Sequence, residues 1–154
     1  MRKDPQAAER TAPPPSREEA AFLELSRTNE MLSRPFAALM KLEDLSPTQY
    51  NVLRILRGAP KGLTCGEIGN RMITRDPDIT RLLDRLEKRD LISRCRETKD
   101  RRMVMTRIMP GGLKVLGRLD GPVLKTHQRQ LGHMGKQQLR TLMGLLKEAR
   151  QNTL

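Results

Sequence analysis

The sequence has almost no aromatic residues, with two Phe, one Tyr and no Trp among its 154 residues. A core must therefore be built from Leu, Ile, Val, Met and Ala, which favours packed helices over a sheet sandwich. The chain is long enough to bury such a core without disulfides or metals. These features predict a mainly helical chain of about one typical domain.

Cysteine and long apolar runs are also scarce. Cys65 and Cys95 are too few for a disulfide framework in a chain of this length. No stretch approaches the roughly 18 apolar residues that a membrane span needs, and no N-terminal segment has the apolar centre of a signal peptide. We therefore expect a cytoplasmic protein with no membrane partner.

Motifs for enzyme chemistry are missing as well. The sequence contains no G-x-S-x-G motif, no phosphate-binding loop and no pair of candidate catalytic carboxylates. His127 and His133 have no Cys or carboxylate companions at the spacing of metal ligands. We therefore expect no enzymatic activity, no cofactor and no metal site.

Positive charge is what the sequence has in excess. Thirty Lys and Arg residues stand against 18 Asp and Glu residues, which gives a formal net charge of +12. Such an excess indicates an anionic partner, either nucleic acid or an acidic membrane surface. On charge alone, a basic protein without such a partner remains an alternative.

Helix-start signals divide the chain. Residues 16–19 (SREE), 46–49 (SPTQ) and 64–67 (TCGE) each match a capping box. Pro35 should kink the first of these helices or split it in two. Asp76 and Pro77 should open a further helix that ends near Arg89, with Asp76 as its N-cap. The apolar residues of that helix recur at helical spacing: Ile79, Leu82, Leu83 and Leu86.

The pattern changes after this helix. Residues 91–96 and 102–108 match two short strands, joined by the polar tip at 97–101. A short helix, a turn at 73–75 and an amphipathic helix form a helix-turn-helix, and the hairpin directly after it forms a wing. The expected fold is thus mainly α with a small β-hairpin wing, a winged helix-turn-helix.

Helical patterns also flank this core. Residues 1–15 are polar and contain three consecutive prolines, which is typical of a flexible arm. A helix should follow the break at Pro110-Gly111-Gly112, and Gly121-Pro122 should interrupt or kink it. A last helix should end by about Arg150.

The outward face of the helix-turn-helix suggests contact with DNA. Arg81 and Arg85 are one turn apart on one face, and an arginine in the major groove can donate two hydrogen bonds to a guanine edge. On the alternative interpretation, both arginines pair with Asp78 and Asp84 on a solvated face. The hairpin carries six basic residues against two acidic ones, which suits phosphates and a minor groove. We expect DNA contacts from Thr74, Arg75, Asp78, Thr80, Arg81, Arg85, Lys99, Asp100, Arg101 and Arg102.

Three segments resemble one known family. Residues 45–53 (LSPTQYNVL) are similar to the second helix of the MarR family of bacterial transcription regulators, and residues 78–92 (DITRLLDRLEKRDLI) to its recognition helix. Asp100-Arg101-Arg102 matches the D-x-R signature of its wing. Gly112 falls where the family has the glycine of an L-T-x-x-G motif.

Two positions depart from the family pattern. Ile108-Met109 replaces the L-T pair, so a capping hydroxyl for the next helix is missing. Asp90 stands where the family commonly has a glycine. Both departures affect local geometry more than function.

The resemblance implies a homodimer on double-stranded DNA. Residues 16–45 and 110–150 would be N- and C-terminal dimerisation helices, and residues 46–109 the winged helix-turn-helix lobe. Two recognition helices would then enter successive major grooves of a pseudo-palindromic operator, and the expected outcome is repression. The alternative is that the terminal Leu stripes fill an intramolecular bundle.

Sensing is a further implication of the resemblance. Many family members release DNA when they bind a small aromatic or acidic effector, and Phe36, Met40, Tyr50 and Arg54 would line such a pocket. Ordinary core packing is the favoured alternative for these four residues. Cys65 should be the first residue of a helix, a position that makes a thiol more reactive and suggests redox sensing. A purely structural cysteine is favoured, since peroxide-sensing members carry theirs near the N-terminus.

A different class of function stays open. A basic winged-helix module can bind protein or RNA rather than operator DNA, as an interaction or adaptor domain. Outward-facing Asp78 and Asp84 would support that alternative, because carboxylates on a recognition face repel phosphates.

Overall fold

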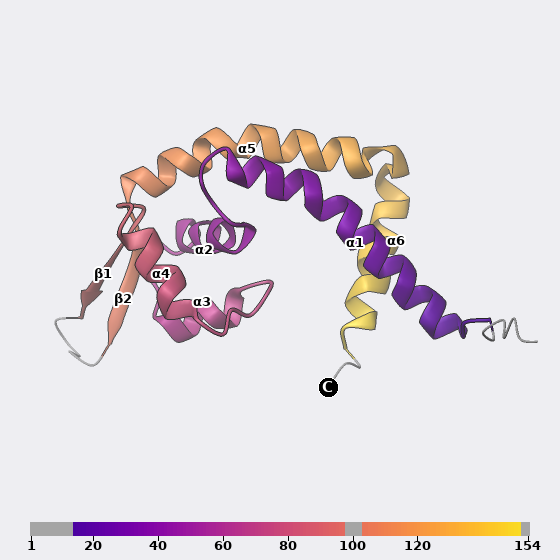
Figure 1. Ribbon diagram of the computed structural model, residues 1–154, viewed down its shortest axis with the longest axis horizontal. Coiled ribbons are helices and arrows are strands. Elements are labelled where there is room, and N and C mark those ends of the chain that lie inside the picture. The colour runs from indigo at the N-terminus through magenta and orange to yellow at the C-terminus, as the bar shows by residue number, and fades with distance from the viewer. Residues whose placement is uncertain (1–13, 98–102, 152–154) are drawn as a thin grey trace, which may run out of the picture. The chain divides into compact units, whose positions relative to one another are not determined.

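The structure is a computed structural model that describes residues 14–97 and 103–151. It divides into two units, Met1–Ser33 and Arg34–Leu154. The elements are mainly helical with one hairpin, as the sequence predicts (Figure 1). In chain order they are α1 (Arg17–Lys41), α2 (Pro47–Arg57), α3 (Cys65–Arg71), α4 (Ile79–Glu87), β1 (Ile92–Arg96), β2 (Val104–Ile108), α5 (Pro110–Leu131), a 3-10 turn (Gly132–Met134) and α6 (Gly135–Ala149).

The capping boxes of α2 and α3 form as predicted. The Gln49 N–H donates to Ser46 Oγ at 3.1 Å, and the Ser46 N–H donates back to Gln49 Oε1 at 2.9 Å. Thr64 and Glu67 exchange the same two bonds at 3.3 and 2.8 Å. These bonds satisfy N–H groups that a helix start leaves without a partner, so local sequence alone determines where both helices begin.

The predicted start of α4 is wrong by about two residues. Asp78, not Asp76, is the N-cap, and its side chain accepts from the Arg81 N–H at 3.3 Å. Asp76 instead accepts from the Asp78 N–H at 2.9 Å. This is an Asx-turn, in which a side chain bonds to the backbone two residues on. The turn takes up Asp76 and Pro77, so the helix begins after them.

The prolines do not divide the long helices. α1 runs through Pro35 and α5 runs through Pro122. Of the two predicted alternatives at these residues, a kink or a split, the split is therefore wrong. A proline removes one backbone hydrogen bond, to the carbonyl four residues earlier. Here those carbonyls belong to Met31 and Arg118, which are exposed, so water can bond to them. The helical run is interrupted only after α5, where Gly135, at the start of α6, has a φ of 73°.

One apolar core holds the second unit together. α2, α4, the hairpin and α5 supply most of its fully buried side chains, and Figure 1 shows the hairpin beside α4. β1 and β2 pair antiparallel, with Ile92 opposite Ile108. Leu63 adds a bridge to the outer edge of β2, through bonds of 3.0 and 2.8 Å with Thr106. The largest fully buried side chains are Met40, Leu53, Leu56, Ile68, Leu83, Leu86, Ile92 and Leu116.

The start of α5 packs directly on the backbone that leaves α4. A Cβ atom on Gly112 would lie 2.4 Å from the Leu91 carbonyl oxygen, and the Met109 N–H donates to that same oxygen at 2.9 Å. Met109 provides no side-chain cap, as expected from the missing hydroxyl. Asp90 has a φ of 54°, the left-handed conformation that glycine adopts without strain. Both departures from the family pattern are therefore visible in the geometry.

Arginines join the same region to neighbouring elements. The Arg89 guanidinium follows α4 and donates to the Glu43 and Asp44 carbonyls in the α1–α2 turn. The Glu43 carboxylate in turn accepts two bonds from Arg118 of α5, at 2.7 and 2.6 Å. A similar two-pronged pair between Arg57 and Asp120 joins α2 to α5. The end of α4, the α1–α2 turn and α5 are thus connected in a ring.

The close approach at Gly112 predicts a large effect of a single methyl group. Gly112→Ala should lower the free energy of unfolding by about 1–3 kcal/mol, because the neighbouring atoms are backbone and cannot move away cheaply. Gly117→Ala is the matched control, since it adds the same methyl to α5 in open space. It should raise stability by about 0.5–1 kcal/mol. Urea unfolding at equal protein concentration measures both, and equal stabilities for the two variants would contradict the packing described.

The Glu43–Arg118 pair predicts a dependence on acid. Hydrogen bonds from Arg118 hold the pKa of Glu43 below its ordinary value. A carboxyl with a lowered pKa in the folded state stabilises the fold above its unfolded pKa, and this is lost as the pH falls through the folded pKa. Glu43→Gln should therefore lose less stability than the unaltered protein between about pH 5 and pH 3. Thermal melts over this range test it, with Glu148→Gln as control; parallel curves for all three proteins would contradict it.

Candidate nucleic-acid interface

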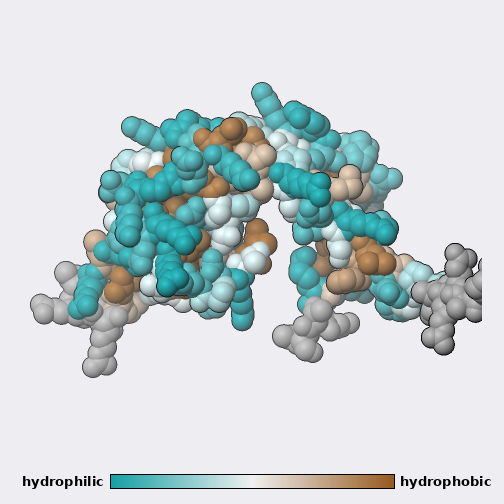
Figure 2. Space-filling view, in the orientation of Figure 1, coloured by the Kyte–Doolittle hydropathy of each residue, from teal (hydrophilic) through white to brown (hydrophobic). Residues whose placement is uncertain are grey.

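The two faces of α4 differ as the sequence predicts. Leu82, Leu83 and Leu86 are buried in the core, while Thr80, Arg81 and Arg85 on the other face are exposed. Figure 2 shows hydrophilic side chains covering the lobe around α4. A helix with one apolar face held by a core and one exposed basic face can enter the major groove.

The two arginines on that face are in different states. The Arg81 Nε lies 3.1 Å from Asp78 Oδ2, although the Arg81 side chain is 78% exposed. The Arg85 side chain makes no ion pair or hydrogen bond with any residue of the described ranges. The alternative of two internal pairs on this face is therefore right for Arg81 and Asp78, and wrong for Arg85 and Asp84. Arg85 presents a guanidinium that nothing in the described chain engages.

A hydrogen bond to α2 holds the turn before α4 in place. Thr74 and Arg75 are exposed there, as expected for residues at a DNA surface. The Ile73 N–H donates to Asn51 Oδ1 of α2 at 3.0 Å. Asn51 was not expected to matter, because nothing in its local sequence shows that the turn comes back to it. The bond holds the segment between α3 and α4 at a defined position.

The hairpin presents less positive charge than its sequence suggests. Lys99, Asp100, Arg101 and Arg102 lie outside the described residues. Among the other hairpin cations, Arg96 is exposed. Arg94 pairs with Glu87 and Asp84 of α4, and Arg107 donates to the Lys61 carbonyl at 3.1 Å and to Glu97 at 3.3 Å. Arg94 and Arg107 therefore bind other parts of the protein, and the expectation that both add to a DNA-facing charge is wrong.

Asp84 also differs from expectation. It was placed on the outward face, but its carboxylate accepts from Arg94 of β1. Hydrogen bonds from Arg94 lower the pKa of Glu87, and Glu87 in turn raises the pKa of Arg94. Glu87 and Arg94 consequently stay charged at neutral pH. The carboxylate that would have repelled DNA at position 84 faces the hairpin and is matched by a guanidinium.

The residues expected to form an effector pocket do lie together. The Phe36 ring meets Tyr50 edge-on at 5.5 Å between centroids, and Arg54 lies 5.9 Å from the centre of the Tyr50 ring. Met40 and Tyr50 are buried in the core, so ordinary packing accounts for much of the group. His127 of α5 stacks on Phe36 at 5.8 Å. His127 was considered only as a metal ligand in the sequence, because its place beside Phe36 depends on the fold.

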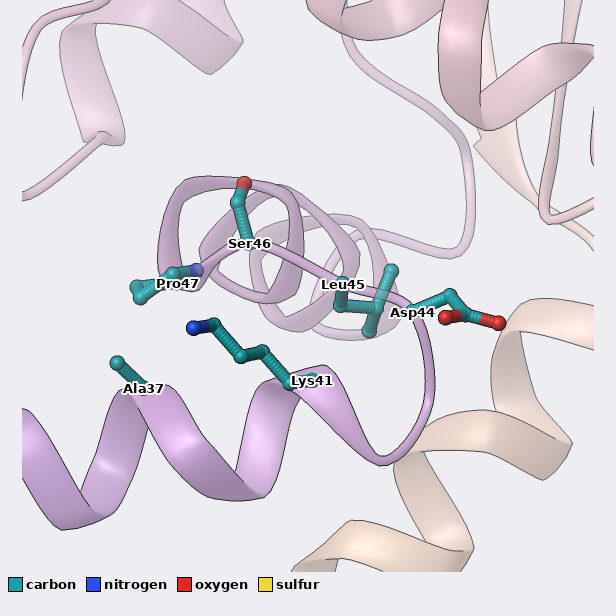
Figure 3. Close-up of a pocket in the computed structure, with 6 residues that line it drawn as sticks. All are labelled: Ala37, Lys41, Asp44, Leu45, Ser46 and Pro47. Atoms are coloured by element: carbon teal, nitrogen blue, oxygen red, sulfur yellow. The ribbon is translucent and has the colours of Figure 1, made fainter.

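A separate cleft of about 520 Å³ lies nearby, between the end of α1 and the start of α2 (Figure 3). None of the four expected effector residues lines it. In Figure 3 the Lys41 side chain extends toward Pro47, while the Asp44 carboxylate points away. The residues around it are Ala37, Lys41, Asp44, Leu45, Ser46 and Pro47.

Cys65 is the first residue of α3 and half-buried, and Cys95 is exposed on β1; both are free thiols. Within residues 14–97 and 103–151, no group of three His, Cys, Asp or Glu side chains is arranged to hold a metal ion. No helix in the same ranges is long and apolar enough to cross a membrane.

Comparison with known proteins places the chain in a family. The family model described as MarR family matches residues 45–104. The chain is 37% identical to a MarR transcription factor of known structure from Planctomyces limnophilus, with a TM-score of 0.67, over 88% of this chain and 98% of that one. It is also 37% identical over 65 residues to the HTH-type transcriptional repressor MdtR of Bacillus subtilis, which is 42% of this chain and 41% of the relative.

A further structure shares the fold. It is a mutant MarR from E. coli complexed with operator DNA, with a TM-score of 0.76 and 23% identity, over 84% of this chain and 93% of that one. The family consists of transcription regulators rather than enzymes, which agrees with the expectation from the sequence. The winged helix-turn-helix, the family model and the full-length similarity lead to one conclusion: the chain belongs to the MarR family of transcription regulators.

Proposed function

We propose that this chain is a repressor that binds pseudo-palindromic operator DNA as a homodimer. The observation that carries the proposal is the exposed face of α4, where the Arg85 guanidinium has no partner in the described chain. This face lies directly beside the hairpin, in a chain of a family of transcription regulators. Similarity to a transcriptional repressor over 65 residues supports repression as the outcome.

In the proposed complex, the arginines of α4 would contact bases, and the residues around the start of α4 would contact phosphates. Arg85 and Arg81 would donate to base edges in the major groove. Arg81 would leave Asp78 to do so, and Asp78 would then only cap α4. Phosphate contacts would come from the turn and from the start of α4, through Thr74, Arg75 and Thr80. The wing residues Lys99, Arg101 and Arg102 keep their expected role at the minor groove and the adjoining phosphates. Asp100 would accept from nearby backbone N–H groups or hold Arg102 in place.

A second copy of the chain would cover exposed apolar side chains. Phe22 is 67% exposed and Met31 73% exposed on α1, and α6 has no buried residue at all. Exposed apolar side chains in such number mark an interaction surface, because each square ångström covered contributes about 25 cal/mol. Residues 16–45 and 110–150 would then be the dimerisation helices around the lobe of residues 46–109. The exposed apolar residues on these helices are Phe22, Leu23, Leu25, Met31, Leu113, Leu124, Met143 and Leu145.

An effector would act at the aromatic group of the second unit. A small aromatic acid could stack on Phe36 in place of His127 and place its carboxylate at Arg54, with Met40 and Tyr50 as the apolar floor. Entry of such a ligand would separate α5 from the end of α1. The adaptor alternative is less favoured, because Asp84 pairs with Arg94 and Asp78 caps α4.

Selection from a random DNA library tests the proposal. The recovered duplex should contain two inverted half-sites with centres about 10 base pairs apart, and should bind two chains. Gel shifts should show an affinity at least about a thousandfold higher for it than for a random duplex or an RNA hairpin. Equal affinity for all three nucleic acids would contradict operator binding.

Arg85 should matter more than Arg81. Arg85→Ala should cost about 1–3 kcal/mol on the selected duplex and relax the preference at one position of each half-site. Arg81→Ala should cost less, because its guanidinium must first leave Asp78. Lys61→Ala, in the exposed loop between α2 and α3 and outside the proposed dimerisation helices, removes the same charge and serves as control. Binding measured on the selected and the random duplex decides this, and an equal loss on both for Arg85→Ala would show that it contacts only phosphates.

A further inference from the structure

A single arginine joins the hairpin to the recognition helix. The Arg94 Nε of β1 donates to Glu87 Oε2 at 2.9 Å, and its Nη2 donates to both Glu87 and Asp84. The backbone N–H of Arg94 donates to the other oxygen of Glu87 at 3.0 Å. Asp84 and Glu87 are three residues apart on the last turns of α4. One guanidinium and one backbone amide of the strand are therefore bound to two carboxylates of the helix.

The position of Arg94 explains why it is unsuited to contact DNA itself. Its side chain is 25% exposed, and its Nε and Nη2 donors are occupied by the two carboxylates. Within the described residues, the ion pairs between α4 and the hairpin are those of Arg94 with Asp84 and Glu87. The opposite edge of the hairpin is held separately, by Leu63 on Thr106 and by Arg107 on the Lys61 carbonyl. The strands are thus attached on both sides, and Arg94 provides the charged attachment on the α4 side.

We propose that Arg94 is a positioning residue that fixes the angle between hairpin and α4, so that both meet DNA at the same time. The inference rests on the proposed DNA binding. A recognition helix and a wing touch different grooves, and phosphate contacts determine the register of one relative to the other. Contacts of this kind require placement to within about 0.5 Å. A charge-assisted, two-pronged arginine pair supplies such directional constraint, which apolar contacts do not.

An effect of net charge alone and a positioning role of Arg94 predict opposite changes in DNA affinity for one triple variant. Asp84→Asn, Glu87→Gln and Arg94→Met combined remove two negative charges and one positive charge, so the net charge rises by one. If charge alone governed binding, this triple variant would bind DNA more tightly. If Arg94 sets the angle, it should bind more weakly despite the added charge. Removing Arg94 alone would not discriminate, because it leaves two unmatched carboxylates near DNA.

The experiment compares the triple variant with the unaltered full-length chain on the duplex recovered from selection. We expect affinity to fall about tenfold, and the slope of log affinity against log salt to become shallower by about one contact or more. Hydroxyl-radical protection should be lost at the flanking minor grooves, while the base preference assigned to Arg85 is retained. A merely structural role would weaken both regions together.

Two controls keep the outcome clear. Asp90→Asn raises the net charge by one, as the triple variant does, at an exposed residue outside the proposed dimerisation helices, and should not weaken binding. If the triple variant melts early, Arg94→Lys replaces it, since an ammonium retains the charge but cannot span both carboxylates; an intermediate loss with altered flanking protection is then expected. Affinity equal to or higher than that of the unaltered protein, with unchanged flanks, would overturn the role of Arg94. Lack of preference for the selected duplex in the unaltered protein would overturn operator binding as well.

Discussion

The close approach of α5 to the backbone leaving α4 is the constraint on which the rest of the lobe depends. Gly112 lies so near the Leu91 carbonyl that no side chain fits between them, and the same carbonyl accepts from Met109. Asp90 turns the chain in a left-handed conformation at this point. The helix α4, the hairpin and the long helix α5 consequently begin or end against one another. Backbone packing at Gly112 places the start of α5 against the chain that joins α4 to β1.

Arginine pairs complete what backbone packing begins. Arg89 bonds to the α1–α2 turn, and Glu43 of that turn bonds to Arg118 of α5. Arg94 then joins the hairpin to α4. These guanidiniums act as directional connectors, because their planar donor geometry matches a carboxylate or two carbonyls at once. Part of the large positive charge of the chain is therefore structural, and a count of basic residues overstates the charge offered to a partner.

The local chemistry of the sequence predicts most of the fold. The boxes at Ser46 and Thr64 involve atoms three residues apart, so they form whatever the rest of the chain does. The start of α4 was misplaced because two aspartates compete for nearby N–H groups, and the Asx-turn of Asp76 is an equally local solution. Pro122 fails to break α5 because its cost is one hydrogen bond, whereas buried residues on both sides of it, from Gly112 to Val123, pack the helix on the core.

The sequence by itself determined the winged helix-turn-helix, the apolar stripe of α4 and the outward position of Arg81 and Arg85, because periodicity and capping act over a few residues. Only the tertiary structure decided which charges are available. Arg94 and Arg107 lie in the same hairpin as Arg96, yet they bind partners that are seven to 46 residues away. The stacking of His127 on Phe36 likewise spans most of the chain. Contacts between residues distant in sequence depend on how the elements pack, and no local pattern encodes them.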